Sequence, residues 1–298
     1  MNSKIKFYIP DYGNLADMDL IKRNVILAER IKNEGIGEVL ISRSASDIEV
    51  LLFHTNKYID ALKTGYPSEI ASSGQNWHKT IYEDKKKCAG AILNAIDESL
   101  VSGISGALCL GGHHALPDQG GALSVLNEIG IGIMYAKGKV NKIIMLDLDV
   151  HFSNGTTIGL AKVEDVFLFD YYGHASNFNR PDTTHLFRNL SEEPYGGFYL
   201  NMLRKELPRV LDQFQPNLCI YLSGMDVFKG SSNAKLFLTE RDIELREEFV
   251  FHQFAERKIP IAYMHGGGYF SEETASHFHY ITAKAAVNAF LEFYTKSR

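Results

Sequence analysis

The stretch "KIIMLDLDVH", residues 142–151, decides the fold of this chain. Its apolar run KIIML is followed, at alternate positions, by Asp147, Asp149 and His151. Such a run is typical of a strand buried on both faces, and alternate residues of an extended chain point to the same side. Two carboxylates and an imidazole on one buried face cost free energy unless something compensates their charge. We therefore expect a divalent cation at this end of the strand.

Similar apolar runs recur along the chain and predict further strands. They lie at 4–10, 37–42, 106–112, 142–149, 165–170, 218–224 and 260–268. Helical spacing of apolar residues predicts helices at 19–35, 239–258 and 281–296, with Gly35 closing the first and Thr239 capping the second. This alternation predicts an α/β fold with three α/β/α layers and a mainly parallel central sheet. No repeat or linker divides the sequence, so we expect one domain over residues 1–298.

The composition narrows the class of protein and of partner. The 298 residues are 45% hydrophobic and 22% charged, as in ordinary globular proteins. A net charge of −5 argues against non-specific nucleic-acid binding. The three cysteines lack metal-site spacing, and their small, odd number favours a reducing compartment. The N-terminus has no signal-peptide pattern and no apolar run approaches a membrane span. We expect a cytoplasmic protein that binds neither nucleic acid nor membrane.

Four polar motifs each follow one of the predicted strands. They are "GGHH" at 111–114, "DVH" at 149–151, "SGMD" at 223–226 and "HGGGY" at 265–269. In open α/β sheets, ligands bind at the carboxyl ends of the strands. The sequence therefore predicts that these motifs meet in one functional site.

Asp149, His151 and Asp226 are the candidate metal ligands. Three protein ligands with one open position are typical of a catalytic rather than a structural site. Two carboxylates and an imidazole suit Zn²⁺, but also Fe²⁺, Mn²⁺ or Co²⁺. The alternative interpretation is that Asp149 caps the next helix and His151 is an ordinary loop histidine.

His113 and His114 are candidate general acids or bases, because an imidazole titrates near neutral pH. Asp147 and Asn154 could each orient one of them, and a neutral Asn stabilises an imidazolium less than a carboxylate does. Tyr269, on a turn of three glycines, could donate a hydrogen bond to a developing oxyanion. Taken singly, these motifs favour a surface histidine pair and a Gly-rich turn with a packing tyrosine.

In this order and spacing, the motifs resemble those of the histone deacetylase family, which has the arginase/deacetylase fold. The family pattern is tandem His, D-x-D-x-H, a later strand-end Asp and a Gly-Gly-Tyr turn. The segment 51–62, "LLFHTNKYIDAL", is also similar to the family's "VHT-x-x-Y" segment, so the resemblance runs from about residue 50 to about residue 280. Asn154 matches the class IV branch.

The resemblance implies a zinc-dependent deacylase that cleaves Nε-acyl-lysine in a peptide or protein. Asp149, His151 and Asp226 would bind the metal, which could also be Fe²⁺. His114 would act as general base and then acid, His113 with Asp147 would tune the electrostatics, and Tyr269 would polarise the carbonyl. A structural K⁺ could lie near the carbonyls of residues 147–151 and the Asp170 region. The substrate channel would include Gly112, Leu123, Phe178 and Gly267.

The sequence departs from the family where the channel wall is expected. Ala122-Leu123 stand where the family commonly has Gly-Phe, which could widen the channel toward longer acyl chains. Three alternatives remain open: an amidase for small acyl amides such as acetylated polyamines, a two-metal ureohydrolase, and an inactive acyl-binding module. Ser153 stands where the ureohydrolase would need a carboxylate. The oligomeric state is left open.

Overall fold

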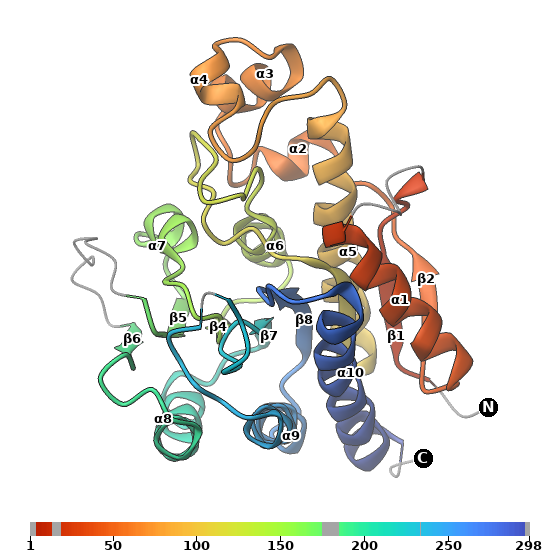
Figure 1. Cartoon of the computed structure of the whole chain (residues 1–298), viewed down its shortest axis with the longest axis vertical. Coiled ribbons are helices and arrows are strands. Elements are labelled where there is room, and N and C mark those ends of the chain that lie inside the picture. The colour runs from red at the N-terminus through yellow and green to blue at the C-terminus, as the bar shows by residue number, and fades with distance from the viewer. Residues whose placement is uncertain (1–3, 14–18, 175–184, 233, 296–298) are drawn as a thin grey trace.

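Eight strands form one sheet in the computed structural model of the chain, which describes residues 4–13, 19–174, 185–232 and 234–295 (Figure 1). They are β1 Lys6–Ile9, β2 Glu38–Ile41, β3 Ile104–Leu110, β4 Ile143–Asp147, β5 Val166–Tyr172, β6 Leu186–Asn189, β7 Leu218–Gly224 and β8 Ile261–Gly266. Their order across the sheet is β2-β1-β3-β8-β7-β4-β5-β6, and every ladder between these described strands is parallel.

Helices cover both faces of the sheet, which confirms the predicted three-layer fold. The helices are α1 Asp19–Asn33, α2 Asp47–Val50, α3 Asn56–Thr64, α4 Ser68–Ala71, α5 Ile81–Ser102, α6 Glu128–Ala136, α7 Asn154–Leu160, α8 Gly196–Phe214, α9 Glu240–Glu256 and α10 Glu272–Tyr294. The helices α1, α8, α9 and α10 pack against one face, and α5, α6 and α7 lie on the other (Figure 1).

Strand β4 shows why the apolar runs are continuous rather than alternating. Ile144 and Leu146 belong to the core shared with α8 and α9, whereas Ile143 and Met145 belong to the core shared with α5 and α6. Because successive side chains of a strand point to opposite faces, a strand covered on both sides needs an apolar residue at every position.

Every predicted strand and helix is present, although some ends differ, whereas β6 and the helices α2 to α8 were not among the predictions. The predicted cap Thr239 is confirmed, and the structure adds a capping box, because Thr239 Oγ1 accepts from the Asp242 N–H while the Asp242 carboxylate accepts from the Thr239 N–H. Strand β6 was not predicted because it is a short edge strand without a continuous apolar run. Its Arg188 forms an ion pair with Glu206. Helix α10 begins at Glu272, well before the predicted start at residue 281, and Ser271 caps it.

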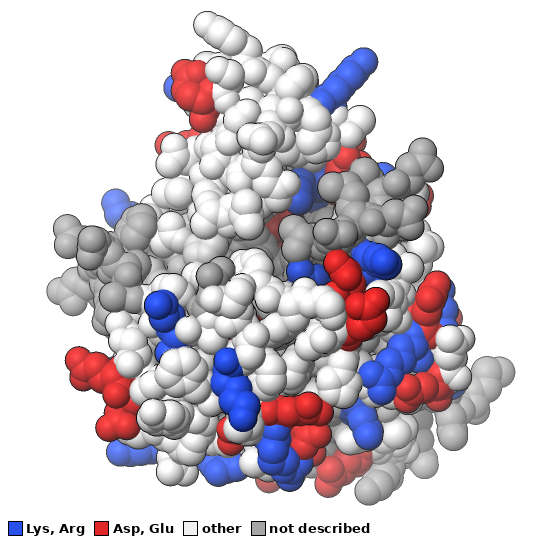
Figure 2. All heavy atoms as spheres, in the orientation of Figure 1, with Lys and Arg blue, Asp and Glu red and all other residues white. Residues whose placement is uncertain are grey.

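The surface carries charges of both signs. On the face shown in Figure 2, acidic and basic side chains gather over α1, α8, α9 and α10 and are interspersed, while the part above them is mainly uncharged. Among the described residues, none of the helices is long and apolar enough to cross a bilayer. The expected absence of nucleic-acid and membrane partners, like the cytoplasmic location, stays a prediction.

Candidate active site

The strand order brings the four polar motifs together. Strands β3, β8, β7 and β4 are consecutive neighbours in the sheet, so the segments that follow them leave the same edge. Backbone hydrogen bonds join these segments: Gly111 N–H donates to the His265 carbonyl at 2.9 Å, and Leu148 N–H donates to the Leu222 carbonyl at 3.1 Å. The tertiary structure therefore brings the four motifs together at one edge of the sheet.

The chain turns directly after β4, and this corrects one expectation. Strand β4 ends at Asp147, so residues 147, 149 and 151 do not share one extended face. The turn is held by side-chain acceptors: His151 N–H donates to Asp149 Oδ1 at 2.9 Å, and Val150 N–H donates to Asp226 Oδ1 at 3.0 Å. As a result, Asp149 and His151 face Asp226, while Asp147 points to the tandem histidines.

Asp149, His151 and Asp226 offer ligand atoms that all lie within 4.8 Å of one another. His151 Nδ1 is 3.0 Å from Asp149 Oδ1 and 3.1 Å from Asp226 Oδ2. Burial disfavours a charged His151 ring, yet the two carboxylates outweigh burial and raise its pKa to about 10. Burial and the Asp149 charge raise the pKa of Asp226 to about 6. Such concentrated negative charge suits a bound cation.

Three further observations test whether these residues fit a metal ion. Asp226 Oδ2 is fully buried, and its contact with His151 Nδ1 at 3.1 Å lacks hydrogen-bond geometry. Gly267 has φ +35°, and a Cβ there would lie 2.3 Å from the Asp226 carboxyl group. A Cβ on Gly224 would lie 2.3 Å from Asp149 Cα. Glycines thus let the backbone close around a buried carboxylate whose Oδ2 makes no well-formed hydrogen bond with the described residues, which suits a metal ligand.

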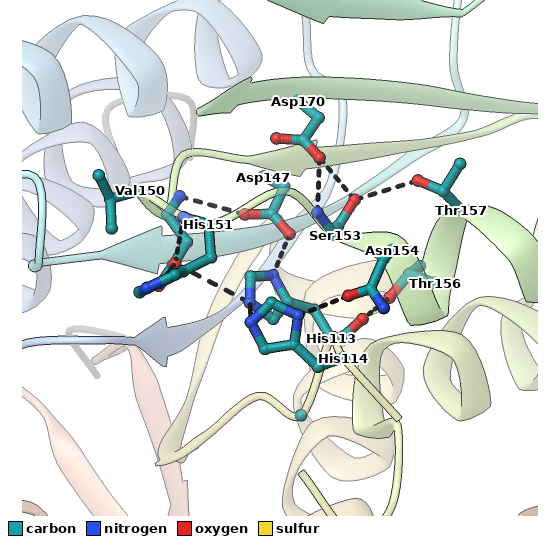
Figure 3. A network of polar contacts seen from close by, with 12 residues as sticks. His113, His114, Asp147, Val150, His151, Ser153, Asn154, Thr156, Thr157 and Asp170 are labelled. Carbon is teal, nitrogen blue, oxygen red and sulfur yellow. Dashed lines mark hydrogen bonds and ion pairs between the residues drawn. The ribbon is translucent and has the colours of Figure 1, made fainter. Parts of the chain in front are cut away.

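The tandem histidines have different partners, as the sequence predicted. His113 Nδ1 lies 2.8 Å from Asp147 Oδ2, and His114 Nδ1 lies 2.6 Å from Asn154 Oδ1 (Figure 3). Burial opposes a charge on His113, but the Asp147 carboxylate outweighs it and raises the His113 pKa to about 9. Burial and the His113 charge lower the His114 pKa to about 3. His113 is therefore cationic and His114 neutral at pH 7.

A buried cradle that the motifs did not reveal holds the backbone of the tandem histidines. Asn127 Nδ2 donates to the Ala115 carbonyl at 2.8 Å, and Thr156 N–H donates to the His113 carbonyl at 3.0 Å. His54 Nε2 accepts from the Asn127 N–H at 2.9 Å. Burial lowers the His54 pKa to about 4, which keeps that nitrogen free to accept. The only sequence signal for this cradle was His54, which lies in the 51–62 segment.

One cavity of about 190 Å³ joins these groups. Its lining includes His113, His114, Asp149, His151 and Tyr269. Tyr269 is 37% exposed, and burial and the Asp149 charge raise its pKa to about 12. The phenol is therefore protonated at neutral pH and can donate a hydrogen bond into the cavity.

The predicted channel residues lie at this cavity, apart from Phe178, which is outside the described residues. Gly112, Leu123 and Gly267 line it. Leu123 is 59% exposed, and the backbone of Ala122 and Leu123 is left-handed, with φ +42° and +69°. Arg23, which the sequence analysis missed, donates to the Gly267 carbonyl at 3.0 Å and the Gly268 carbonyl at 2.8 Å.

Asp170 forms a second buried acidic position behind the site. Ser153 donates to Asp170 Oδ2 from its N–H at 2.9 Å and from its hydroxyl at 2.6 Å (Figure 3). Asp170 Oδ1 is buried and has no hydrogen-bond partner among the described residues. Burial and the nearby Asp147 charge raise the Asp170 pKa.

Comparison with known proteins identifies relatives of the chain. The family description "Histone deacetylase domain" matches residues 18–285. Histone deacetylase 2 of Arabidopsis thaliana is 27% identical over 246 residues, which cover 76% of this chain and 62% of that protein. A histone deacetylase-like amidohydrolase of Pseudomonas aeruginosa is 26% identical over 245 residues, covering 76% and 64%.

Two further matches extend the comparison. Polyamine deacetylase HDAC10 of Danio rerio is 23% identical over 254 residues, covering 74% of this chain and 37% of that protein. The chain thus matches less than two thirds of the length of all three of these relatives. The crystal structure of the HDA15 HD domain superposes with a TM-score of 0.78 at 15% identity, over 97% of this chain and 90% of that one. This likeness shows the shared fold.

Proposed function

Because the chain belongs to the histone deacetylase family, we propose that it is a metal-dependent amide hydrolase that removes the acyl group from an Nε-acyl-lysine or a small acyl amide. One observation carries the proposal: His113, His114, Asp149, His151 and Tyr269 border a single cavity. Asp226 completes the metal cluster from just behind it, and Asp147 and Asn154 bond to the two histidines. Such a cavity, with clustered titratable groups of perturbed pKa, is the arrangement expected of an active site.

Asp149, His151 and Asp226 would hold the metal, Zn²⁺ or Fe²⁺. Bound there, the ion would supply Lewis acidity toward the amide carbonyl and would make a nearby water more acidic. Support comes from the donor set, the burial of both carboxylates and the close approach of the three ligand atoms.

His114 is the proposed general base and, later, the general acid. It is neutral at pH 7, because burial and the charge on His113 lower its pKa. Asn154 Oδ1 accepts from His114 Nδ1–H, a tautomer that leaves Nε2 as the basic nitrogen. His114 Nε2 would take a proton from the attacking water and return it to the leaving amine, whose C–N bond then breaks.

His113 and Asp147 form the proposed electrostatic partner of that base. The ion pair between His113 Nδ1 and Asp147 Oδ2 is buried, with Asp147 fully inaccessible to solvent. A fixed positive charge beside His114 destabilises its protonated form, so protonated His114 readily transfers the proton to the leaving amine. His113 Nε2 lies 3.1 Å from His114 Nε2, which places the charge next to the base.

Tyr269 is the proposed oxyanion donor. Its ring centroid lies 6.4 Å from that of His151, in an edge-to-face arrangement across the cavity. Because its pKa is raised to about 12, the phenol keeps its proton and can donate to the carbonyl oxygen as negative charge develops there.

A structural monovalent cation such as K⁺ would fit near Asp147 and Asp170. The support is chemical: Asp170 Oδ1 is a buried oxygen without a donor, and Asp147 adds negative charge beside it. The carbonyls of residues 147–151 would complete an oxygen-rich site of the kind that such cations prefer.

The substrate could be an acylated lysine in a protein or a free acyl amide such as an acetylated polyamine. Both reactions would use the same catalytic residues, and one relative is named a polyamine deacetylase. The acyl-chain length is linked to Leu123, whose side chain stands exposed at the cavity. Membership of class IV, suggested by Asn154, stays a prediction. An inactive acyl-binding module is disfavoured, because the metal cluster, both histidine pairs and Tyr269 are all in place.

The decisive experiment is turnover of fluorogenic acyl-lysine peptides, from acetyl to myristoyl, and of N-acetylated polyamines. The protein is first stripped with a chelator and then supplied with Zn²⁺ or Fe²⁺. We expect hydrolysis that the added metal restores, and the profile of chain lengths and amines then identifies the substrate class. Metal-loaded protein that hydrolyses none of these amides would contradict the enzyme proposal and favour a binding role.

A further inference from the structure

Arg246 of α9 is a charged side chain in the interior of the protein. It is fully buried, and its guanidinium pairs with the carboxylate of the adjacent Glu247, with Nε and Nη2 each 2.7 Å from Oε1. Tyr221 donates to the same carboxylate oxygen at 2.8 Å. A buried ion pair of this kind is costly to desolvate and adds little net stability by itself, so its other contacts are informative.

The remaining donors of Arg246 reach two backbone carbonyls. Nη1 donates to Leu148 O at 3.2 Å, and Nη2 donates to Gly224 O at 2.9 Å. Leu148 stands between the two aspartates of the turn after β4, and Gly224 ends β7, two residues before Asp226. One side chain therefore bonds to both segments that carry the proposed metal ligands.

A guanidinium is suited to this task because its N–H groups have fixed directions. The planar fork sets the spacing and orientation of the two carbonyls that it binds. The ammonium of a lysine is a compact point charge, which could keep the ion pair with Glu247 but would not reproduce a fixed bridge between two carbonyls.

The distance between the two segments matters for the ligands. Val150 N–H donates to Asp226 Oδ1 at 3.0 Å, and Gly224 packs so closely that a Cβ there would lie 2.3 Å from Asp149 Cα. A small shift of either backbone segment would therefore change the separation of the Asp149 and Asp226 carboxylates. Metal affinity depends on that separation, because ligands are bound at defined distances.

We propose that Arg246 is a positioning residue that holds the Leu148 and Gly224 carbonyls in register and thereby sets the affinity of the Asp149–His151–Asp226 site for its metal. This rests on the proposed function of that cluster as the metal site. Arg246 itself touches neither substrate nor metal in this scheme.

The test measures metal affinity rather than turnover. Arg246→Lys keeps the charge but not the fork, and Arg246→Met/Glu247→Gln removes both charges so that neither is left buried alone. The matched control is Arg188→Lys, which alters the ion pair of Arg188 with the buried Glu206, between β6 and α8. The Zn²⁺ dissociation constant comes from competition with a chromogenic chelator, and thermal unfolding is followed with and without saturating Zn²⁺.

Both Arg246 variants should bind Zn²⁺ about 10–100-fold more weakly than the wild type, the usual effect of removing a partner that orients a metal ligand. Their Tm should also rise less when Zn²⁺ is added. The Arg188→Lys control should change the Tm of the metal-free protein and leave the Zn²⁺ dissociation constant unaltered.

Two results would overturn the inference, and they are distinguishable. If either folded Arg246 variant has a lower Tm but binds Zn²⁺ as tightly as the wild type, Arg246 serves folding alone. The double variant decides the question if Arg246→Lys does not fold. If the wild type and the Arg188→Lys control themselves bind no Zn²⁺, the proposed metal site fails, and the role of Arg246 fails with it.

Discussion

His265 of β8 and His279 of α10 should make the protein sensitive to mild acid. The rings are stacked, with centroids 4.1 Å apart and planes at 13°, and both residues are fully buried. None of their four ring nitrogens has a hydrogen-bond partner among the described residues. Burial and the charge of Arg23 lower the His265 pKa to about 3, and burial, His265, Arg23 and Arg246 lower that of His279. Both rings are therefore neutral in the folded protein.

The size of the effect follows from the difference between folded and unfolded protein. A histidine in the unfolded chain has a pKa of about 6.5, so below that pH the unfolded state binds a proton that the folded state does not. The contribution of the neutral rings to the free energy of unfolding is therefore fully present above pH 6.5, and it is lost as the pH falls toward the folded pKa. The pH of 5 lies about 1.5 units below the unfolded-chain pKa. A histidine that stays neutral in the fold therefore lowers the free energy of unfolding by about 2 kcal/mol at this pH, and the pair lowers it by about 4 kcal/mol. That is a large part of a typical stability of about 5–15 kcal/mol.

The assay is urea unfolding at pH 7 and pH 5 for the wild type and for His279→Phe, which keeps a ring in the stack but cannot bind a proton. The drop in the free energy of unfolding between the two pH values should be about 2 kcal/mol smaller in the variant. His252→Phe, on the exposed side of α9, supplies the baseline for replacing one histidine. An equal drop in the wild type and in His279→Phe would refute the reasoning, because His279 would then bind its proton as readily in the folded protein as in the unfolded chain.

Three further predictions concern the cavity. Tyr269→Phe should lower kcat by about 10²–10³ while metal content, measured by atomic absorption, stays the same; full activity would remove Tyr269 from the mechanism. Gly267→Ala should weaken Zn²⁺ binding by about tenfold or more, because its Cβ would lie 2.3 Å from the Asp226 carboxyl group. In the control Gly197→Ala, the added Cβ meets no atom within 4 Å, so this variant should bind Zn²⁺ as the wild type does. Ala122→Gly should raise the free energy of unfolding by about 1 kcal/mol, since φ +42° strains an alanine, and a lower Tm would contradict this.

The fold class could be read from the sequence because its signal is local. The run at 142–149 has apolar residues at four successive buried positions of β4, Ile143 to Leu146, as a strand covered on both faces needs. The same logic gave Asp149, His151 and Asp226 as candidate metal ligands, because each follows an apolar run and each carries a carboxylate or an imidazole that can bind a metal ion. Strand β6 lacked this signal, because "LFRN" is short and lies at the sheet edge.

The partners of the site residues could not be read in the same way. Arg23 and Arg246 lie in amphipathic helices, where an arginine is normally a solvated residue, yet both are buried against backbone carbonyls of the site. Asn127 looks like a simple helix cap, and it does cap α6, but its amide also supports the tandem histidines. Nothing in the spacing of these residues distinguishes the two roles.

The sequence by itself determined the periodicity of the elements and the side-chain chemistry that follows each strand. Only the tertiary structure decided that β3, β8, β7 and β4 are neighbours, which brings residues more than a hundred positions apart to one edge of the sheet. The physical reason is that periodicity reports which face of an element avoids water. Strand order and buried polar contacts depend on how separate elements pack, and that information lies in no single stretch of the chain.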